Sequence, residues 1–234
     1  MANLPPLREL NERIVRCRRC KRLRDHCQAV ARKKTARFRE QAYWGKPVPN
    51  LVAPGRRAPR LLVVGLAPAA HGANRTGRMF TGDRSGDFLF RAMHETGFCN
   101  QPEAWAADDG LALRDAAITA TVHCAPPDNK PTPDEQANCR EYLVATFEAL
   151  PRLRAVVCLG QLAHTAVLRL YKQRGWIDRL SDHPFAHGAL HRFTTTAPPI
   201  VDSYHPSQQN TFTGRLTPAM LRQVFEQARQ LVEA

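Results

Sequence analysis

The chain has 234 residues, 43% of them hydrophobic, which is enough for one sizeable α/β domain and too few for two large ones. It contains no apolar run of membrane-spanning length, and its first residues lack the basic-then-apolar plan of a secretory signal, so we expect a soluble, cytoplasmic protein. The formal net charge of +13 favours nucleic acid over a membrane as the partner.

The positive charge is concentrated at the start of the chain. Residues 1–60 hold 17 Lys and Arg against 4 Asp and Glu, whereas residues 61–234 hold 17 of each kind. A basic segment attached to a neutral domain is typical of a protein that binds a polyanion, because phosphate backbones attract it strongly. The alternative is a solvated basic helix with no specific partner.

Two regions follow from these patterns. Apolar residues among many charges predict a surface helix over 7–24, and a stretch rich in Pro and Gly over 43–60 predicts an extended connection. We therefore expect residues 1–59 to form a basic helical and extended segment that packs on the main domain. Residues 60–234 are expected to form that α/β domain.

The main domain alternates apolar runs with helical patterns. The runs at 60–65, 116–122, 155–159 and 200–204 predict four buried parallel strands. The segments 83–97, 133–150, 161–173 and 217–232 predict helices. This alternation predicts a parallel sheet with helices on both faces.

A loop of small residues follows the first predicted strand. It runs from Gly65 to Asp83 and contains several glycines. Such a loop lets the backbone approach a ligand closely, and open α/β sheets bind ligands at the carboxyl ends of their strands. The loop is the first candidate for an active site, although a Gly-rich turn can also serve only as a connection.

The seven cysteines are an odd number, and a disulfide framework is not expected. Cys17 and Cys20 form a CxxC pair, and Cys124 and Cys139 flank a loop that can fold back towards it. Four thiolates would then bind one metal centre, either zinc or an iron–sulfur cluster, and the residues alone leave that choice open. The other three cysteines are expected to be unligated: Cys27, Cys99 and Cys158.

Three separated blocks resemble a known family. They are 65–83, 124–139 and 203–211, and with the CxxC pair they span nearly the whole chain. The chain resembles the uracil-DNA glycosylase superfamily, and most closely its family 5, the type B enzymes. The resemblance implies a three-layer α/β/α sandwich around a four-stranded parallel sheet. It also implies a structural 4Fe-4S cluster with the ligands Cys17, Cys20, Cys124 and Cys139.

The resemblance also implies three catalytic residues. His205 would donate a hydrogen bond to the departing base, and a loop-packing role is its alternative. Asp83 would activate water and stabilise the cationic sugar, because Ala67 replaces the acid or amide of many relatives; Asp87 is the nearest competitor. Asn129 would hold water or the sugar-phosphate, unless it only forms a turn.

The same resemblance suggests how the substrate is bound. Phe80 would stack on a base flipped out of the duplex, unless it is a core residue, and the segment after His205 would enter the minor groove. Small Ala69 and the absence of an asparagine in 118–121 predict a roomy pocket that also accepts hypoxanthine or other deaminated bases. The candidate substrate-binding residues are Gly65, Ala67, His71, Phe80 and Gln208.

The sequence thus predicts a monomeric, monofunctional enzyme that excises uracil from DNA and is associated with the nucleoid. Lys130 raises the question of strand cleavage through a Schiff base, but we expect it to contact phosphate. The main alternative is a non-catalytic nucleic-acid-binding protein with an iron–sulfur or zinc centre. Another is a relative that acts on a different lesion.

Overall fold

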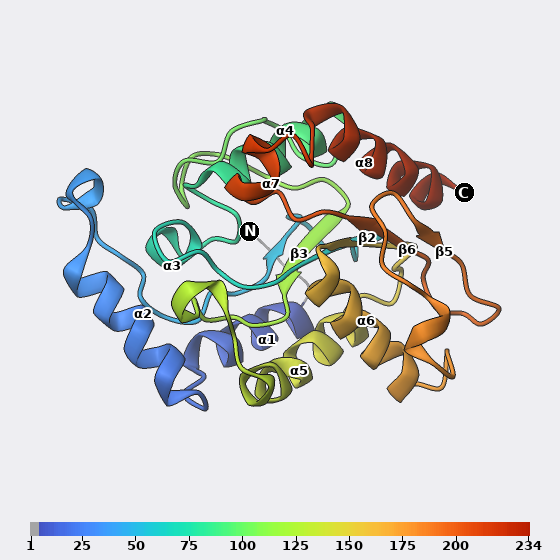
Figure 1. Ribbon diagram of the computed structural model, residues 1–234, viewed down its shortest axis with the longest axis horizontal. Coiled ribbons are helices and arrows are strands. Elements are labelled where there is room, and N and C mark those ends of the chain that lie inside the picture. The colour runs from blue at the N-terminus through green and yellow to red at the C-terminus, as the bar shows by residue number, and fades with distance from the viewer. Residues whose placement is uncertain (1–4) are drawn as a thin grey trace.

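The computed structural model describes residues 5–234 and shows a twisted sheet between two layers of helices (Figure 1). Over that range the sheet has six strands in the order β1-β3-β2-β4-β6-β5. The strands are β1 (Leu51–Val52), β2 (Leu61–Gly65), β3 (Ala116–Ala120), β4 (Ala155–Leu159), β5 (Leu190–His191) and β6 (Ile200–Ser203).

The four inner strands are those predicted from the apolar runs, and all of them are parallel. The expectation of a four-stranded sheet was incomplete, since β1 and β5 extend it on both edges as antiparallel strands. Each edge strand has two residues, too few to leave a periodic pattern in a sequence.

The helices alternate with the inner strands as predicted. They are α1 (Pro5–Arg16), α2 (Lys21–Lys33), α3 (Ala73–Thr76), α4 (Arg84–Glu95), α5 (Pro133–Glu148), α6 (Gln161–Gln173), α7 (Gln208–Phe212) and α8 (Pro218–Glu233). Three short 3-10 turns also occur: η1 (Ala36–Phe38), η2 (Pro127–Asn129) and η3 (Leu180–Asp182). None of the helices within residues 5–234 is both long and apolar enough to cross a membrane.

The single helix predicted over 7–24 was wrong. Two helices, α1 and α2, meet there at the CxxC pair. The last turn of α1 closes with a hydrogen bond from Cys17 N to Ile14 O (3.0 Å), and Cys20 has an extended backbone before α2 begins. The break turns the chain at the two cysteines, so both are displayed at a corner between helices.

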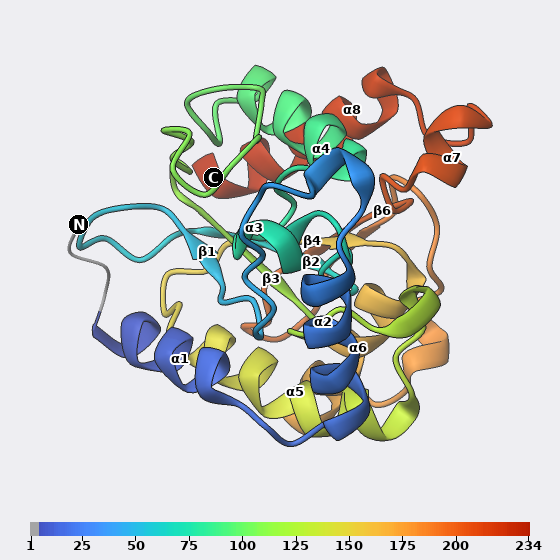
Figure 2. The same cartoon turned by 90° about the vertical axis from the view of Figure 1, so that its left-hand side faces the viewer.

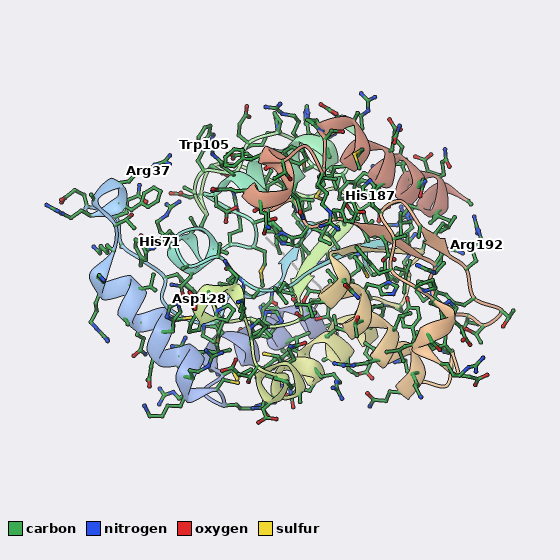
Figure 3. The ribbon with its side chains drawn as sticks, in the orientation of Figure 1. Arg37, His71, Trp105, Asp128, His187 and Arg192 are labelled. Atoms are coloured by element: carbon green, nitrogen blue, oxygen red, sulfur yellow. The ribbon has the colours of Figure 1, made fainter. Side chains whose placement is uncertain are left out.

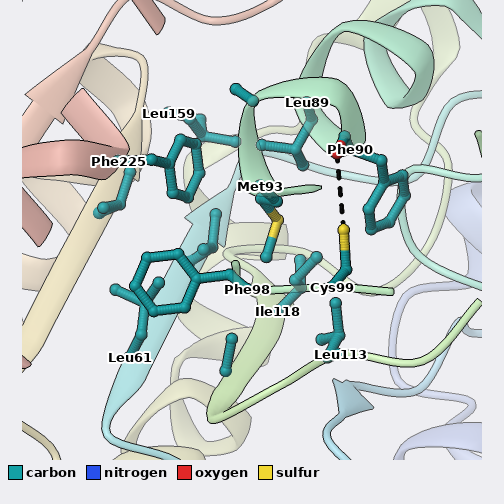
Figure 4. Close-up of a cluster of buried hydrophobic side chains, with 14 of the residues drawn as sticks. Leu61, Leu89, Phe90, Met93, Phe98, Cys99, Leu113, Ile118, Leu159 and Phe225 are labelled. Atoms are coloured by element: carbon teal, nitrogen blue, oxygen red, sulfur yellow. Dashed lines mark hydrogen bonds between the residues drawn. The ribbon is translucent and has the colours of Figure 1, made fainter. Parts of the chain in front are cut away.

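The core has two halves, one on each face of the sheet (Figure 2). Successive residues of a strand point to opposite faces, so Leu61 and Val63 pack against α4 and α8, while Leu62 and Val64 pack against α1, α2, α5 and α6. Figure 4 shows the first half, in which Phe98 and Phe225 pack with their ring centroids 6.2 Å apart. The architecture is therefore a three-layer α/β/α sandwich.

The basic segment is built into this fold. Leu7, Leu10 and Ile14 of α1 are buried, and Asn11 and Asn50 exchange two hydrogen bonds of 3.0 Å. Strand β1 then pairs with β3. Residues 1–4 of the predicted segment 1–59 lie outside the described residues.

The strand order creates a crevice beside β2. Strands β3 and β4 lie on opposite sides of β2, so the chain crosses over between them. Ligands of open α/β sheets bind at such a reversal, beyond the carboxyl ends of the strands.

Candidate active site

A cavity of about 620 Å³ opens at the carboxyl ends of the inner strands. Its walls come from four segments far apart in the sequence: the loop 66–69 after β2, the start of α4 at 83–85, η2, and 205–209 after β6. Asp128 of η2 is labelled at this opening in Figure 3. The cavity lies where the strand order predicts a ligand.

Asp83 lines the cavity as the N-cap residue of α4. One carboxylate oxygen, Oδ1, accepts a hydrogen bond from Gly86 N at 3.0 Å. Burial nevertheless raises the pKa of Asp83 above its usual value. The competing carboxylate of Asp87 faces a separate groove beside Phe212, so Asp83 is the acid that meets the cavity.

The other oxygen of Asp83 lies against Gly72. A Cβ built on Gly72 would stand only 1.9 Å from Asp83 Oδ2. The missing side chain therefore makes room for the carboxylate, which is a close approach that only glycine permits. Sequence reasoning did not single out Gly72, because nothing in the loop itself indicates which glycine meets the acid.

Phe80 and His205 both line the cavity, and their rings are neighbours. Their ring centroids are 6.1 Å apart and the ring planes are inclined by 32°. Phe80 adopts a positive φ of 52°, which is rare for a bulky residue and typical of a position under functional constraint. The ring lies over Gly65, where a Cβ would stand 2.8 Å from Phe80 Cζ.

His205 follows β6 and is partly buried. Burial lowers the pKa of its ring from 6.5 to about 4, so the imidazole is neutral at physiological pH. Within residues 5–234 its ring nitrogens have no hydrogen-bond partner; the backbone carbonyl of His205 accepts a bond from Asn210 Nδ2 at 2.8 Å. A neutral ring with a free N–H suits hydrogen-bond donation into the cavity.

Asn129 reaches the cavity from an exposed turn. It follows Asp128 in η2, and both have positive φ values, 56° and 52°. Asparagine and aspartate tolerate this conformation best among residues with a side chain. The turn is held from outside by Arg22, whose Nη2 donates to Lys130 O at 3.2 Å.

The structure brings together most of the sequence-predicted residues. The wall contains Asp83, His205, Asn129, Ala67, Phe80 and Gln208. His71 and Gly65 are not among the described residues that line it. The ring of His71 instead shares a 3.0 Å hydrogen bond with the Tyr43 hydroxyl, and Figure 3 shows it on the side of the molecule towards Arg37. Other residues of the wall were not singled out from the sequence, among them the polar Arg84, Ser85 and Ser207.

Arg75 fixes the shape of the Gly-rich loop. It is 7% exposed, and its guanidinium donates to His71 O at 2.8 Å and Gly82 O at 3.0 Å. A third bond runs to Gln41 Oε1 at 2.6 Å, and the Phe38 ring lies 4.0 Å away. Because one side chain joins both ends of 71–82, the loop places Asp83 firmly at the cavity.

The four predicted metal ligands gather beside α5. Cys124 and Cys139 are buried in the same core half against which Cys17 and Cys20 pack. Burial raises the pKa of the Cys139 thiol to about 12, and the neighbouring sulfurs of Cys20 and Cys17 add to the rise. Four cysteines gathered at one place are a donor set that fits a thiolate-ligated metal centre.

Cys27 also lies at this cluster of sulfurs. The thiol is fully buried, lies 3.6 Å from Ala125 O and shares a hydrogen bond with Cys124. Its burial agrees with a packing role, and its contact with Cys124 was not foreseen from the sequence.

Comparison with known proteins identifies the family. The family model described as the uracil DNA glycosylase superfamily matches residues 54–229. A type-5 uracil-DNA glycosylase of Mycobacterium leprae is 48% identical over 224 residues, 95% of this chain and 94% of the relative. Relatives with the same name from Thermus thermophilus and Pyrobaculum aerophilum are each 44% identical, over 93% and 92% of this chain and 94% and 89% of their own. The resemblance is thereby confirmed, and the chain belongs to the uracil DNA glycosylase superfamily, in the group of its type-5 relatives.

Proposed function

We propose that this protein removes uracil from DNA by hydrolysing the bond between base and sugar, which leaves an abasic site. Relatives that are named for this activity align with this chain over nearly their full length. The observation that supports it most strongly is the meeting of Asp83, Phe80 and His205 at one cavity, from segments far apart in the sequence. One chain supplies the whole cavity, which suits a monomer acting on chromosomal DNA.

The first step is extrusion of the damaged nucleotide into the cavity. Flipping a base costs a few kcal/mol, and less at a mispair such as U·G. Stacking on an aromatic ring returns about 1 to 3 kcal/mol, and Phe80 offers such a ring at the wall. A base stacked on Phe80 lies within reach of the neighbouring ring of His205.

Bond cleavage leaves negative charge on the base and positive charge on the sugar. His205 is neutral, so it stabilises the base by donating a hydrogen bond and does not transfer a proton. Asp83 orients the attacking water and its carboxylate offsets the charge on the sugar. Asn129, which also lines the cavity, holds the water or the sugar-phosphate.

We assign a broad base preference to the same cavity. The wall next to β2 consists of small residues, including Ala67, Ala69 and Ala73, and leaves about 620 Å³. Hypoxanthine, a two-ring base, fits such a space better than it fits a tight uracil pocket.

Lys130 is exposed on the turn beside the cavity, where it suits contact with phosphate, and the enzyme is monofunctional.

The four cysteines suit a 4Fe-4S cluster better than a single zinc ion. Soft thiolates bind zinc and iron–sulfur clusters alike, and the resemblance to the family 5 enzymes favours the cluster. Cys17, Cys20, Cys124 and Cys139 would hold the cluster, which would supply a structural cross-link between the N-terminal helices and α5, because hydrolysis transfers no electrons.

The test is alkali-revealed cleavage of labelled duplexes with a single U·G pair, using cluster-loaded protein under single-turnover conditions. We expect cleavage only after alkali, and a rate loss on the order of 100-fold or more in Asp83→Asn. The matched control is Asp87→Asn, on the same helix but facing another groove, which should retain the rate. A second duplex with hypoxanthine opposite thymine tests the broad preference.

Each outcome is informative. Cleavage without alkali means that the enzyme also cuts the strand. An equal loss of rate in Asp83→Asn and Asp87→Asn would mean that Asp83 does not have the catalytic role proposed for it. DNA binding with no cleavage of either duplex favours the non-catalytic alternative or another lesion.

A further inference from the structure

Two histidines and an aspartate are buried together beside β6, away from the cavity. His164 lies on α6, His191 on β5 and Asp202 on β6, on the right of Figure 1; Arg192, which follows His191, is labelled in Figure 3. His164 Nδ1 is 2.9 Å from Asp202 Oδ1, and His191 Nε2 is 2.9 Å from Asp202 Oδ2. The three side chains are 3%, 10% and 0% exposed.

The carboxylate of Asp202 requires a positive charge beside it. A buried ionised carboxylate is costly unless it is paired with a cation. The other nitrogen of His164, Nε2, lies 2.9 Å from His183 O, and since a carbonyl can only accept, Nε2 must be the donor. His164 Nδ1 and Asp202 Oδ1, 2.9 Å apart, therefore have between them either a proton, on the ring or on the carboxyl group, or a neighbouring metal ion.

We propose that His164, His191 and Asp202 bind a divalent metal ion, with zinc as the best match to two imidazoles and a carboxylate. Their ligand atoms all lie within 4.8 Å of one another. Donors around a tetrahedral zinc lie roughly 3.3 Å apart, so the two 2.9 Å contacts open by only a few tenths of an ångström. The fourth position is filled by water or by the ring of His183, whose centroid is 5.8 Å from that of His191.

The surroundings match those of a metal site. A histidine that binds a metal usually donates its other ring N–H to a carbonyl or carboxylate, and His164 does so towards His183 O. The Phe185 ring packs 5.6 Å from that of His164 and shields it. The ion links α6, β5 and β6, and β6 leads within three residues to His205, so it stabilises the strand that presents the catalytic histidine.

The experiment is a titration of cluster-loaded protein with Zn²⁺ and with Co²⁺. Prior loading keeps the four cysteine ligands occupied. We expect one equivalent of zinc to bind and to raise the melting temperature, and the cobalt spectrum to show nitrogen and oxygen ligands without a thiolate charge-transfer band. His191→Gln should weaken zinc binding by on the order of 100-fold or more, because it removes a ligand.

The matched control is His94→Gln, an exposed histidine on α4 that should leave zinc binding unchanged. Wild-type protein that binds no zinc beyond its cluster overturns the proposal, as does equal binding by His191→Gln. If His191→Gln does not fold, the cobalt spectrum of the wild type decides alone, since a thiolate band assigns the bound ion to cysteines. In either failure the three residues form only a hydrogen-bonded network.

Discussion

The structure gives a specific prediction for a substitution at Gly72. A methyl group there would overlap Asp83 Oδ2, so Gly72→Ala must turn the carboxylate away from the cavity. A displacement of about 1 Å at a catalytic group costs on the order of 100-fold in rate. We expect a loss of that size in single-turnover uracil excision, with DNA binding unchanged.

The control for this change is Gly175→Ala, where a Cβ meets nothing within 4 Å. It has the cost of a positive φ, 68°, without any contact with the site, and should retain the rate. A normal rate in Gly72→Ala would mean that the carboxylate of Asp83 does not have to occupy its place against the loop.

The pH dependence of excision separates the two central residues. Burial raises the pKa of Asp83 and lowers that of His205 to about 4. As pH falls through the raised pKa, Asp83 is protonated and can no longer activate water, so the rate falls on the acid side. His205 is already neutral above its pKa, so it produces no change of rate near its ordinary value of 6.5.

Single-turnover rates from about pH 5 to 9 measure this profile. Asp83→Asn should lose the acid limb, while His205→Gln should keep it and run on the order of 100-fold to 1000-fold slower. A limb near pH 6.5 that disappears in His205→Gln would show instead that the imidazolium is the working form.

At the residue scale, the sequence predicted the groups with distinctive chemistry and missed those defined by space. Asp83 and His205 were predicted from acid and imidazole side chains in a familiar block, and both line the cavity. Gly72 was missed, and His71, predicted to bind substrate, does not line the cavity within residues 5–234, because both positions depend on how the loop folds around Arg75. A linear sequence does not show which atoms meet after such a turn.

At the element scale, α2 and α5 are clamped together beside the cysteines. Arg22 donates to both oxygens of Glu135, at 2.8 and 2.7 Å, and Glu135 also accepts from Thr132 N at 2.8 Å to cap α5. The hydrogen bonds from Arg22 are the main reason that the pKa of Glu135 lies below its usual 4.5. This contribution to stability is complete above pH 4.5 and is lost as pH falls through the lowered pKa.

Glu135→Ala should therefore loosen the four-cysteine centre. Loss of the helix cap alone lowers the free energy of unfolding by about 1 kcal/mol. We expect a lower melting temperature and a several-fold faster loss of the iron–sulfur absorption in the presence of a chelator. The control is Glu148→Ala. Glu148 lies on α5 like Glu135, but it is exposed and pairs with Arg174, so this variant should retain the cluster. Equal retention by both variants would argue against the clamp.

The elements were predictable where one pattern persists over several turns or a whole buried strand. The four inner strands and the helices after them follow directly from such runs. The break between α1 and α2 was not, since apolar residues continue at helical spacing on both sides of the CxxC pair while the chain turns at Cys17–Cys20. The turn contacts α5, for example through Arg19 and Asn138 O, and such tertiary contacts are not visible in the local spacing of apolar residues.

At the scale of the whole molecule, the fold places basic groups at different ends of the sheet. Helix α2 and η1 extend from the body beside the Gly-rich loop, on the left of Figure 1, so this part of the basic segment lies at the cavity end of the sheet. Arg37 of η1 is exposed there. A second basic group, with Arg152 and Arg154, lies at the amino ends of β2 and β4, the opposite end of the sheet.

Arg37→Ala and Arg152→Ala should consequently differ in DNA binding although each removes one exposed charge. Each phosphate contact contributes about 0.9 to the slope of log affinity against log salt. We expect Arg37→Ala to reduce that slope by about one and Arg152→Ala to leave it unchanged, with both variants excising uracil at the wild-type rate when enzyme saturates the DNA. Fluorescence anisotropy over a range of salt concentrations measures the slopes. Equal changes in the two variants would mean that DNA binding responds to total charge alone. A change confined to Arg37→Ala means that the DNA lies across η1 and the cavity, which is the path that the proposed roles of Asp83 and His205 need.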